Sequence, residues 1–200
     1  MSVAAPSSAG SGHAAETLTA LFYLSMLYVI AAILTAAMAY QYFNHEIPCP
    51  LCLLQRLALF GICFGIIRNF RSGYSDRNTG WSILFTLFLL FVSVRQTLIN
   101  IYPRPGHAYV GSAVFGIHMP VWCVLIAAAT LVAFGLKLTV LGGDHRFEGR
   151  KPAGALATLA TAGAIYVVAL CALNVASVLV QCGVDSCRTS GYRLLGGVQD

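Results

Sequence analysis

Charged residues are scarce in this sequence. Asp, Glu, Lys and Arg make up 10% of its 200 residues, whereas hydrophobic residues make up 58%, and the mean hydropathy is +0.77. These values exclude an ordinary soluble domain and are typical of an integral membrane protein. The net charge of +5 therefore bears on membrane topology, because no basic stretch is interleaved with polar or aromatic residues as on a nucleic-acid surface.

Several catalytic and targeting signatures are also missing. There is no glycine-rich phosphate loop, no apparent Ser/His/Asp arrangement, and no histidine directly after Cys52 to indicate covalent haem attachment. No Lys or Arg precedes the first apolar run, which is too long for the hydrophobic core of a signal peptide. We therefore expect this run to be retained, although Ala36-Ala37-Met38-Ala39 leaves cleavage as an alternative.

Five apolar runs are each long enough to cross a bilayer as an α-helix. We predict an all-α integral membrane helical bundle, with a four-helix core over residues 17–141 and a fifth transmembrane helix over 153–181. We expect a disordered tail over 1–16, a cytoplasmic loop over 142–152 and an external tail over 182–200. The runs are Thr17–Phe43, Leu51–Ile67, Trp81–Ile101, Met119–Leu141 and Ala153–Val180.

Basic residues are distributed unevenly between the two ends of these runs. The loops after the second and fourth runs hold six Lys or Arg, whereas the loops after the first and third runs and the C-terminal tail hold three. By the positive-inside rule the first set is cytoplasmic, and the N-terminus with it. Cys49, Cys52, Cys182 and Cys187 are then all expected on the outer side.

Two local patterns predict packing. Gly61 and Gly65 form a small-residue face in the second run, which lets a neighbouring helix approach closely. In the loop before the fourth run, several apolar residues recur at helical spacing, which favours a segment lying along the membrane surface. These residues are Val110, Ala113, Val114 and Ile117.

Seven cysteines are many for a chain of this size. Four form two close pairs, Cys49/Cys52 and Cys182/Cys187, which indicates an oxidising face of the membrane. The other three lie within apolar runs, where a free cysteine behaves as a small hydrophobic residue. They are Cys63, Cys123 and Cys171. A zinc site made by the two pairs is an alternative, and the three possible pairings of four cysteines stay open.

The first pair has the local features of a redox site. Pro50 suits the first helical position, which predicts Cys49 as the N-cap and places Cys52 in the first turn. The partial positive charge of a helix N-terminus stabilises a thiolate. Arg56 follows at a spacing of four, so both sulfurs and the guanidinium share one helix face. An arginine there can stabilise negative charge on an acceptor oxygen, with snorkelling to the interface as the alternative.

The same stretch resembles a known family. Cys49-Pro-Leu-Cys52-Leu-Leu-Gln-Arg56, followed by Leu57-Ala58-Leu59-Phe60-Gly61, resembles the signature of the disulfide bond formation protein B (DsbB) family. Gly116-Ile117-His118-Met119-Pro120-Val121-Trp122 is similar to the family's Gly-x-x-Met-Pro-x-Trp at the start of its fourth helix. Tyr102-Pro103-Arg104-Pro105 is similar to part of its second external loop, and the resemblance covers roughly residues 20 to 140.

The resemblance implies a quinone-linked thiol oxidase of the bacterial inner membrane. Such a protein reoxidises a periplasmic thioredoxin-like dithiol oxidase (DsbA-type), passes the electrons to ubiquinone or menaquinone, and so supports disulfide bond formation. Cys49 and Cys52 would be the quinone-coupled pair, with Cys52 facing the ring and Arg56 polarising a quinone carbonyl. Met119 would lie near the same pocket, and His118 either there or packed in the loop.

The sequence departs from the family pattern in its second cysteine pair. DsbB proteins usually have four spans and a second pair between spans three and four, but residues 99–122 contain no cysteine. A fifth span instead leads to Cys182 and Cys187. We hypothesise that this pair replaces the missing one and shuttles electrons, with a structural disulfide as the alternative. A non-catalytic membrane subunit or scaffold, and a membrane thiol protein that exports reductant, are the alternative functions.

Overall fold

Five long helices make up most of the protein. The computed structural model describes residues 9–44, 48–101 and 113–182. Its elements are α1 (Ala9–Phe43), α2 (Pro50–Ser72), α3 (Asp76–Ile101), β1 (Ala113–Val114), β2 (Ile117–His118), α4 (Met119–Val140), the 3₁₀-helix η1 (Asp144–Phe147) and α5 (Ala155–Cys182). Within these ranges, all five α-helices are long and apolar enough to cross a membrane. The predicted all-α membrane bundle is confirmed.

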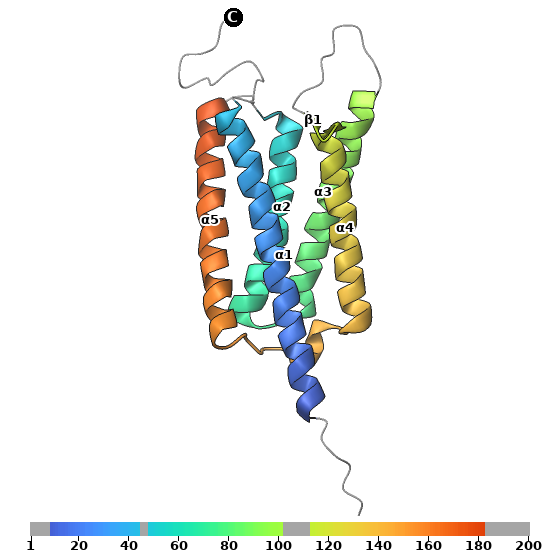
Figure 1. Ribbon diagram of the computed structural model, residues 1–200, viewed down its shortest axis with the longest axis vertical. Helices are drawn as coiled ribbons and strands as arrows, with labels where there is room; N and C mark the ends of the chain where they lie inside the picture. Colours follow the sequence, from blue (N-terminus) through green and yellow to red (C-terminus); the bar gives the residue numbers. More distant parts are fainter. Residues whose placement is uncertain (1–8, 45–47, 102–112, 183–200) are drawn as a thin grey trace, which may run out of the picture.

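The helices stand side by side in an order that differs from their order in the chain (Figure 1). α2 packs against α3, and α3 packs against α4. α1 packs against α2 and α5, and α5 also contacts α2. α5 therefore lies on the opposite side of the bundle from α4, although the two are consecutive in the chain (Figure 1).

The close packing of α2 on α3 depends on two glycines. A Cβ atom at Gly61 would overlap the ring of Phe85, and one at Gly65 would overlap the Ser82 side chain and the Asn78 carbonyl. The predicted small-residue face of α2 is therefore confirmed, and its partner is α3. A short turn joins the two helices through Gly73, whose φ of 94° favours glycine.

α1 begins earlier than the sequence predicts. It starts at Ala9, so residues 9–16, expected to be a disordered tail, are helical. Ala14 and Ala15 favour a helix, whereas Gly10 and Gly12 disfavour it. Arg150 also donates to the Glu16 carboxylate at 2.9 Å, which fastens this part of α1 to the connection between α4 and α5. Residues 1–8 lie outside the described residues.

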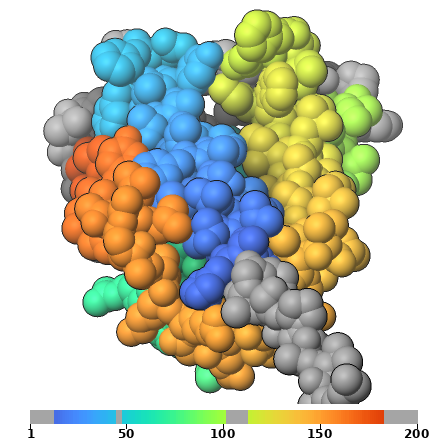
Figure 2. Space-filling model, turned by 60° about the horizontal axis from the view of Figure 1, so that its bottom comes forward, coloured from blue at the N-terminus to red at the C-terminus, as the bar shows by residue number. Residues whose placement is uncertain are grey.

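A buried carboxylate joins several elements at the end of the bundle where α5 begins. Asp144 and Lys137 form an ion pair whose side chains are 0% and 1% exposed. The hydroxyls of Tyr23 and Thr79 also donate to Asp144. Part of the expected loop over 142–152 is thus folded into the bundle, and the connection covers this end around α1 (Figure 2, orange).

The segment before α4 is a hairpin. β1 and β2 pair antiparallel, so residues 113–118 do not form the helix that their apolar spacing favours. Phe115 and Gly116, with φ of 52° and 77°, form a left-handed turn of the kind that closes two-residue hairpins. Trp122 Nε1 donates to the Val114 carbonyl at 3.1 Å and so fixes the hairpin on α4.

Candidate redox site

An apolar cavity of about 370 Å³ lies at the end of the bundle where α2 begins. α1, α2 and α4 supply most of its wall, including Ile33, Leu59 and Ile126. Figure 2 shows a hollow at this end, between α1 (blue) and the hairpin with the start of α4 (yellow-green). The volume falls within the range of roughly 300–1,000 Å³ that is usual for small-molecule and cofactor sites.

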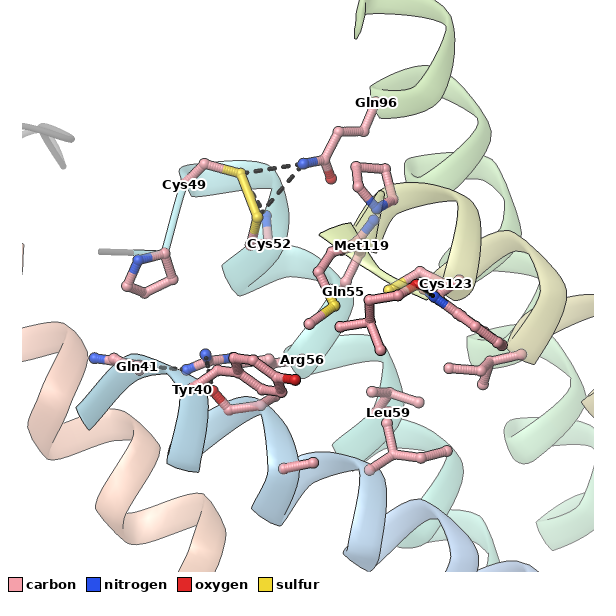
Figure 3. A pocket seen from close by; sticks show the side chains of 18 of the residues that line it. Tyr40, Gln41, Cys49, Cys52, Gln55, Arg56, Leu59, Gln96, Met119 and Cys123 are labelled. Atoms are coloured by element: carbon pink, nitrogen blue, oxygen red, sulfur yellow. Dashed lines mark hydrogen bonds between the residues drawn. A yellow bond between two sulfur atoms is a disulfide. The ribbon is translucent and has the colours of Figure 1, made fainter. Parts of the chain in front are cut away.

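A disulfide between Cys49 and Cys52 lines this cavity (Figure 3). Cys49 is the N-cap of α2 and Pro50 its first residue, as the sequence predicts. The Cys49 sulfur accepts from the backbone N–H of Cys52 at 3.1 Å. The helix N-terminus therefore faces the sulfurs, where its partial positive charge stabilises a thiolate when the disulfide opens.

Arg56 lies on the same wall, deeper in the membrane-spanning part. The residue is 8% exposed, and its Nη1 donates to Gln41 Oε1 at 2.6 Å and to Asn174 Oδ1 at 3.3 Å. Its Nη2 donates to the Ala37 carbonyl at 2.9 Å. These acceptors are neutral, so they fix the guanidinium without themselves cancelling its charge. Figure 3 shows Arg56 beside Gln41 and Tyr40, across the cavity from Gln96.

Gln96 on α3 is a site residue that the sequence interpretation missed. Its Nε2 donates to the Cys49 sulfur at 3.3 Å and to the Cys52 sulfur at 3.4 Å (Figure 3). The residue is 4% exposed, and its Oε1 has no hydrogen-bond partner among the described residues. A glutamine inside an apolar transmembrane run is itself a signal, because such a side chain is costly in lipid.

The opposite wall comes from α4. Met119 lines the cavity, and so does Cys123, one turn further along the helix (Figure 3). Cys123 was expected to be a packing residue, but it is a half-buried free thiol on the cavity wall. His118 does not line the cavity: it is the N-cap of α4 and pairs with Ala113 in the hairpin.

The end of α5 reaches the same end of the bundle. Cys182 is 4% exposed and disulfide-bonded. The neighbouring Gln181 donates from Nε2 to the Pro48 carbonyl at 2.9 Å, so the end of α5 contacts the segment that leads into Cys49. Cys187 lies outside the described residues, and the pairing of Cys182 with it stays a hypothesis.

Together these groups suit an apolar, electron-accepting molecule with polar oxygens. The disulfide can exchange two electrons, and the guanidinium and the Gln96 amide offer hydrogen-bond donors. The described residues hold no cluster of three or more His, Cys, Asp or Glu side chains that could bind a metal ion.

Comparison with family models gives a match to Disulfide bond formation protein DsbB over residues 19–108. Searches of curated proteins and of solved structures found no match. The matched residues contain the cysteine pair, Arg56 and Gln96, whereas α4 and α5 follow them. Residues 19–108 therefore match the family of membrane disulfide bond formation proteins DsbB, and this match supports the resemblance carried by the cysteine motif.

Proposed function

We propose that this protein is a membrane thiol:quinone oxidoreductase of a bacterial inner membrane. It reoxidises a periplasmic thioredoxin-like dithiol oxidase (DsbA-type) and passes the electrons to ubiquinone or menaquinone. The observation that carries the proposal is the Cys49–Cys52 disulfide on the wall of an apolar cavity that also holds the Arg56 guanidinium.

The cavity residues fit a quinone head group. Its ring and alkyl substituents match the apolar walls, and its carbonyl oxygens need donors, which Arg56 supplies. The buried Gln96 Oε1, which has no partner among the described residues, can accept a hydrogen bond from a quinol hydroxyl. Met119 borders the same space, whereas His118 is proposed only to support it through the hairpin.

The chemistry requires a balanced transfer of two electrons and two protons. A bound quinone accepts both, so that the Cys49/Cys52 dithiol becomes a disulfide as quinone becomes quinol. The helix N-terminus and Gln96 Nε2 stabilise the thiolate that forms on either sulfur. Arg56 stabilises negative charge on the acceptor oxygen, and the apolar wall excludes water and strengthens that interaction.

Cys182 and Cys187 are proposed to relay electrons between the soluble oxidase and Cys49/Cys52. The contact between Gln181 and Pro48 supports this role, because it holds the start of the C-terminal segment beside the first pair. The proposed outward orientation of both pairs has separate support. The basic residues of the second and fourth connections lie at the other end of the bundle: Arg68, Arg71, Arg77, Arg146, Arg150 and Lys151.

The test is quinone reduction by the purified protein, with a reduced DsbA-type protein as electron donor. We expect Cys52→Ser to abolish quinone reduction, because the dithiol can no longer close. Cys63→Ser is the matched control: this free thiol is buried in α2 away from the cavity, and the variant should keep its activity. Absence of quinone reduction by the wild type with every such donor would contradict the proposal and favour a scaffold.

The relay is tested in the same assay with Cys182→Ser/Cys187→Ser. We expect this variant to lose activity with the protein donor and to retain it with a small dithiol, which can reduce Cys49–Cys52 directly. Equal activity with both donors would identify the C-terminal pair as structural.

A further inference from the structure

α5 carries a polar stripe near its C-terminal end. Asn174, Ser177 and Gln181 are separated by three and four residues, which places them on one helix face. They are 8%, 7% and 2% exposed, whereas Leu173 and Val175 beside them are 47% and 52% exposed. The stripe faces into the bundle, as expected for polar groups that are costly in lipid.

Each residue of the stripe contacts a different part of the candidate redox site. Asn174 Oδ1 accepts from Arg56 Nη1 at 3.3 Å, and Ser177 Oγ accepts from Gln41 Nε2 at 2.6 Å. Gln181 donates to the carbonyl that precedes Cys49. Each residue of the polar stripe therefore makes a hydrogen bond at the site.

The contact through Gln41 has a directional consequence. A glutamine amide has a donor end and an acceptor end. Its donor end is bound to Ser177 Oγ, and its acceptor Oε1 accepts from Arg56 Nη1 at 2.6 Å. The reverse orientation would place an NH₂ group against a guanidinium that can only donate. Arg56 therefore selects the Oε1 end of Gln41, and the Ser177 hydroxyl supplies the acceptor that the opposite NH₂ group then needs.

We propose that α5 contributes two positioning residues for the Arg56 guanidinium. Asn174 contacts Arg56 directly, and Ser177 acts through Gln41. This inference rests on the proposed function insofar as Arg56 acts on the electron acceptor. It goes beyond the family match, which ends at residue 108 and contains no residue of α5. A bundle of α1 to α4 alone would lack these two supports of the arginine.

The first test needs no quinone. A double-mutant cycle measures how far Asn174→Leu lowers the melting temperature in detergent, once in the wild-type background and once in the Arg56→Leu background. If Asn174 holds Arg56, the two shifts in melting temperature are not additive. The matched cycle of Leu173→Ala with Arg56→Leu should be additive, since Leu173 lies on the exposed face. Additive shifts in the Asn174 cycle would overturn the proposal.

The second test separates positioning from mere support of the fold. In Asn174→Leu/Ser177→Ala we expect kcat/KM for quinone to fall about tenfold, the factor that 1.4 kcal/mol represents. Reduction of Cys49–Cys52 by the thiol donor in a single turnover without quinone should be unchanged. Ser177→Thr keeps the hydroxyl and should restore quinone kinetics when compared with Ser177→Ala.

The outcomes of these tests are distinguishable from failure of the proposed function. An unchanged kcat/KM for quinone, or an equal fall in both half-reactions, would make α5 only a structural helix and overturn the inference. If the wild type reduces no quinone, the proposed function fails, whereas the stability cycle still decides whether α5 holds Arg56.

Discussion

At the scale of single residues, the site is defined by polar side chains that meet in an apolar surrounding. The disulfide sulfurs contact an amide from α3, and the arginine contacts amides from α1 and α5. Gln96 is the most informative of these residues, because its donor end touches both sulfurs. A thiolate is a far better acceptor than a disulfide sulfur, so this contact favours the reduced, opened pair.

Gln96→Leu should therefore make the Cys49–Cys52 disulfide harder to reduce. Loss of a hydrogen bond to a charged group costs about 1.5–3 kcal/mol, which corresponds to a shift of roughly 30–60 mV to more negative potential for a two-electron couple. The measurement is redox equilibration in glutathione buffers, followed by thiol alkylation. Thr97→Val is the control, since among the described residues the Thr97 hydroxyl donates to the Ser93 carbonyl within α3. An unchanged potential would remove Gln96 from the redox site.

The sequence could predict the part of the site that depends on local spacing. Cys49, Pro50, Cys52 and Arg56 occupy one helix start, so their relation follows from helix geometry alone. Gln96 comes from 44 residues beyond Cys52, and no local pattern gives the register between α2 and α3. The contacts of Arg56 with α1 and α5 likewise depend on tertiary packing.

At the scale of elements, the helices were predictable and their contacts were not. Long apolar runs predict the number of spans, but they do not predict which helices α5 packs against. In the structure α5 packs against α1 and α2, and Ser177 of its polar stripe contacts α1. The hairpin before α4 was missed because Phe115 and Gly116 turn the chain inside a stretch with helical apolar spacing. The early start of α1 was missed because its first residues include glycines, and the structure adds a long-range ion pair between Glu16 and Arg150.

The hollow between α1 and the hairpin is the route by which we expect quinone to enter the cavity. Ala36 lies on this route: it lines the cavity and is exposed. We expect Ala36→Phe to raise the KM for quinone about tenfold by filling the space, with the thiol half-reaction unchanged. Ala32→Phe is the control, because Ala32 is exposed on α1 but does not line the cavity. Steady-state kinetics in detergent would decide, and an equal effect of the two substitutions would argue against this route.

The Lys137–Asp144 pair makes a prediction about stability. Removing one partner of a buried ion pair costs about 3–5 kcal/mol, because the other charge is left uncompensated. We expect Lys137→Met to destabilise the bundle by this amount in unfolding experiments in detergent and mixed micelles. Arg146→Met changes an exposed residue of η1 and should alter stability by less than about 0.5 kcal/mol. Equal stability of the two variants would contradict a structural role for the pair.

At the scale of the whole molecule, the candidate redox site and the basic connections lie at opposite ends of the bundle. The cysteine pair, the cavity and the hairpin occupy one end, and the basic connections and the Lys137–Asp144 pair occupy the other (Figure 1). By the positive-inside rule, basic residues gathered at one end of a multi-pass protein set its orientation in the membrane. The proposed exchange with a soluble partner would then take place on one face of the membrane.

Orientation can be tested with single reporter cysteines in an otherwise cysteine-free protein. Phe115→Cys, at a position 92% exposed in the hairpin turn, should react with a membrane-impermeant maleimide in intact cells. Glu148→Cys, exposed after η1, should react only after permeabilisation. The reverse labelling pattern would show that the positive-inside prediction is wrong.

The placement of α5 also has a consequence for biosynthesis. Ribosomes make the chain from its N-terminus, so α1 to α4, with the cysteine pair, leave the ribosome before Asn174 and Ser177 exist. During that interval Arg56 lacks its α5 contact, and the Gln41 amide lacks the hydroxyl that accepts its hydrogen bond. A nascent or truncated chain thus inserts its cysteines into the membrane before the cation beside them is fully held. The contacts around Arg56 are therefore complete only after α5 has been made and has packed against α1 and α2.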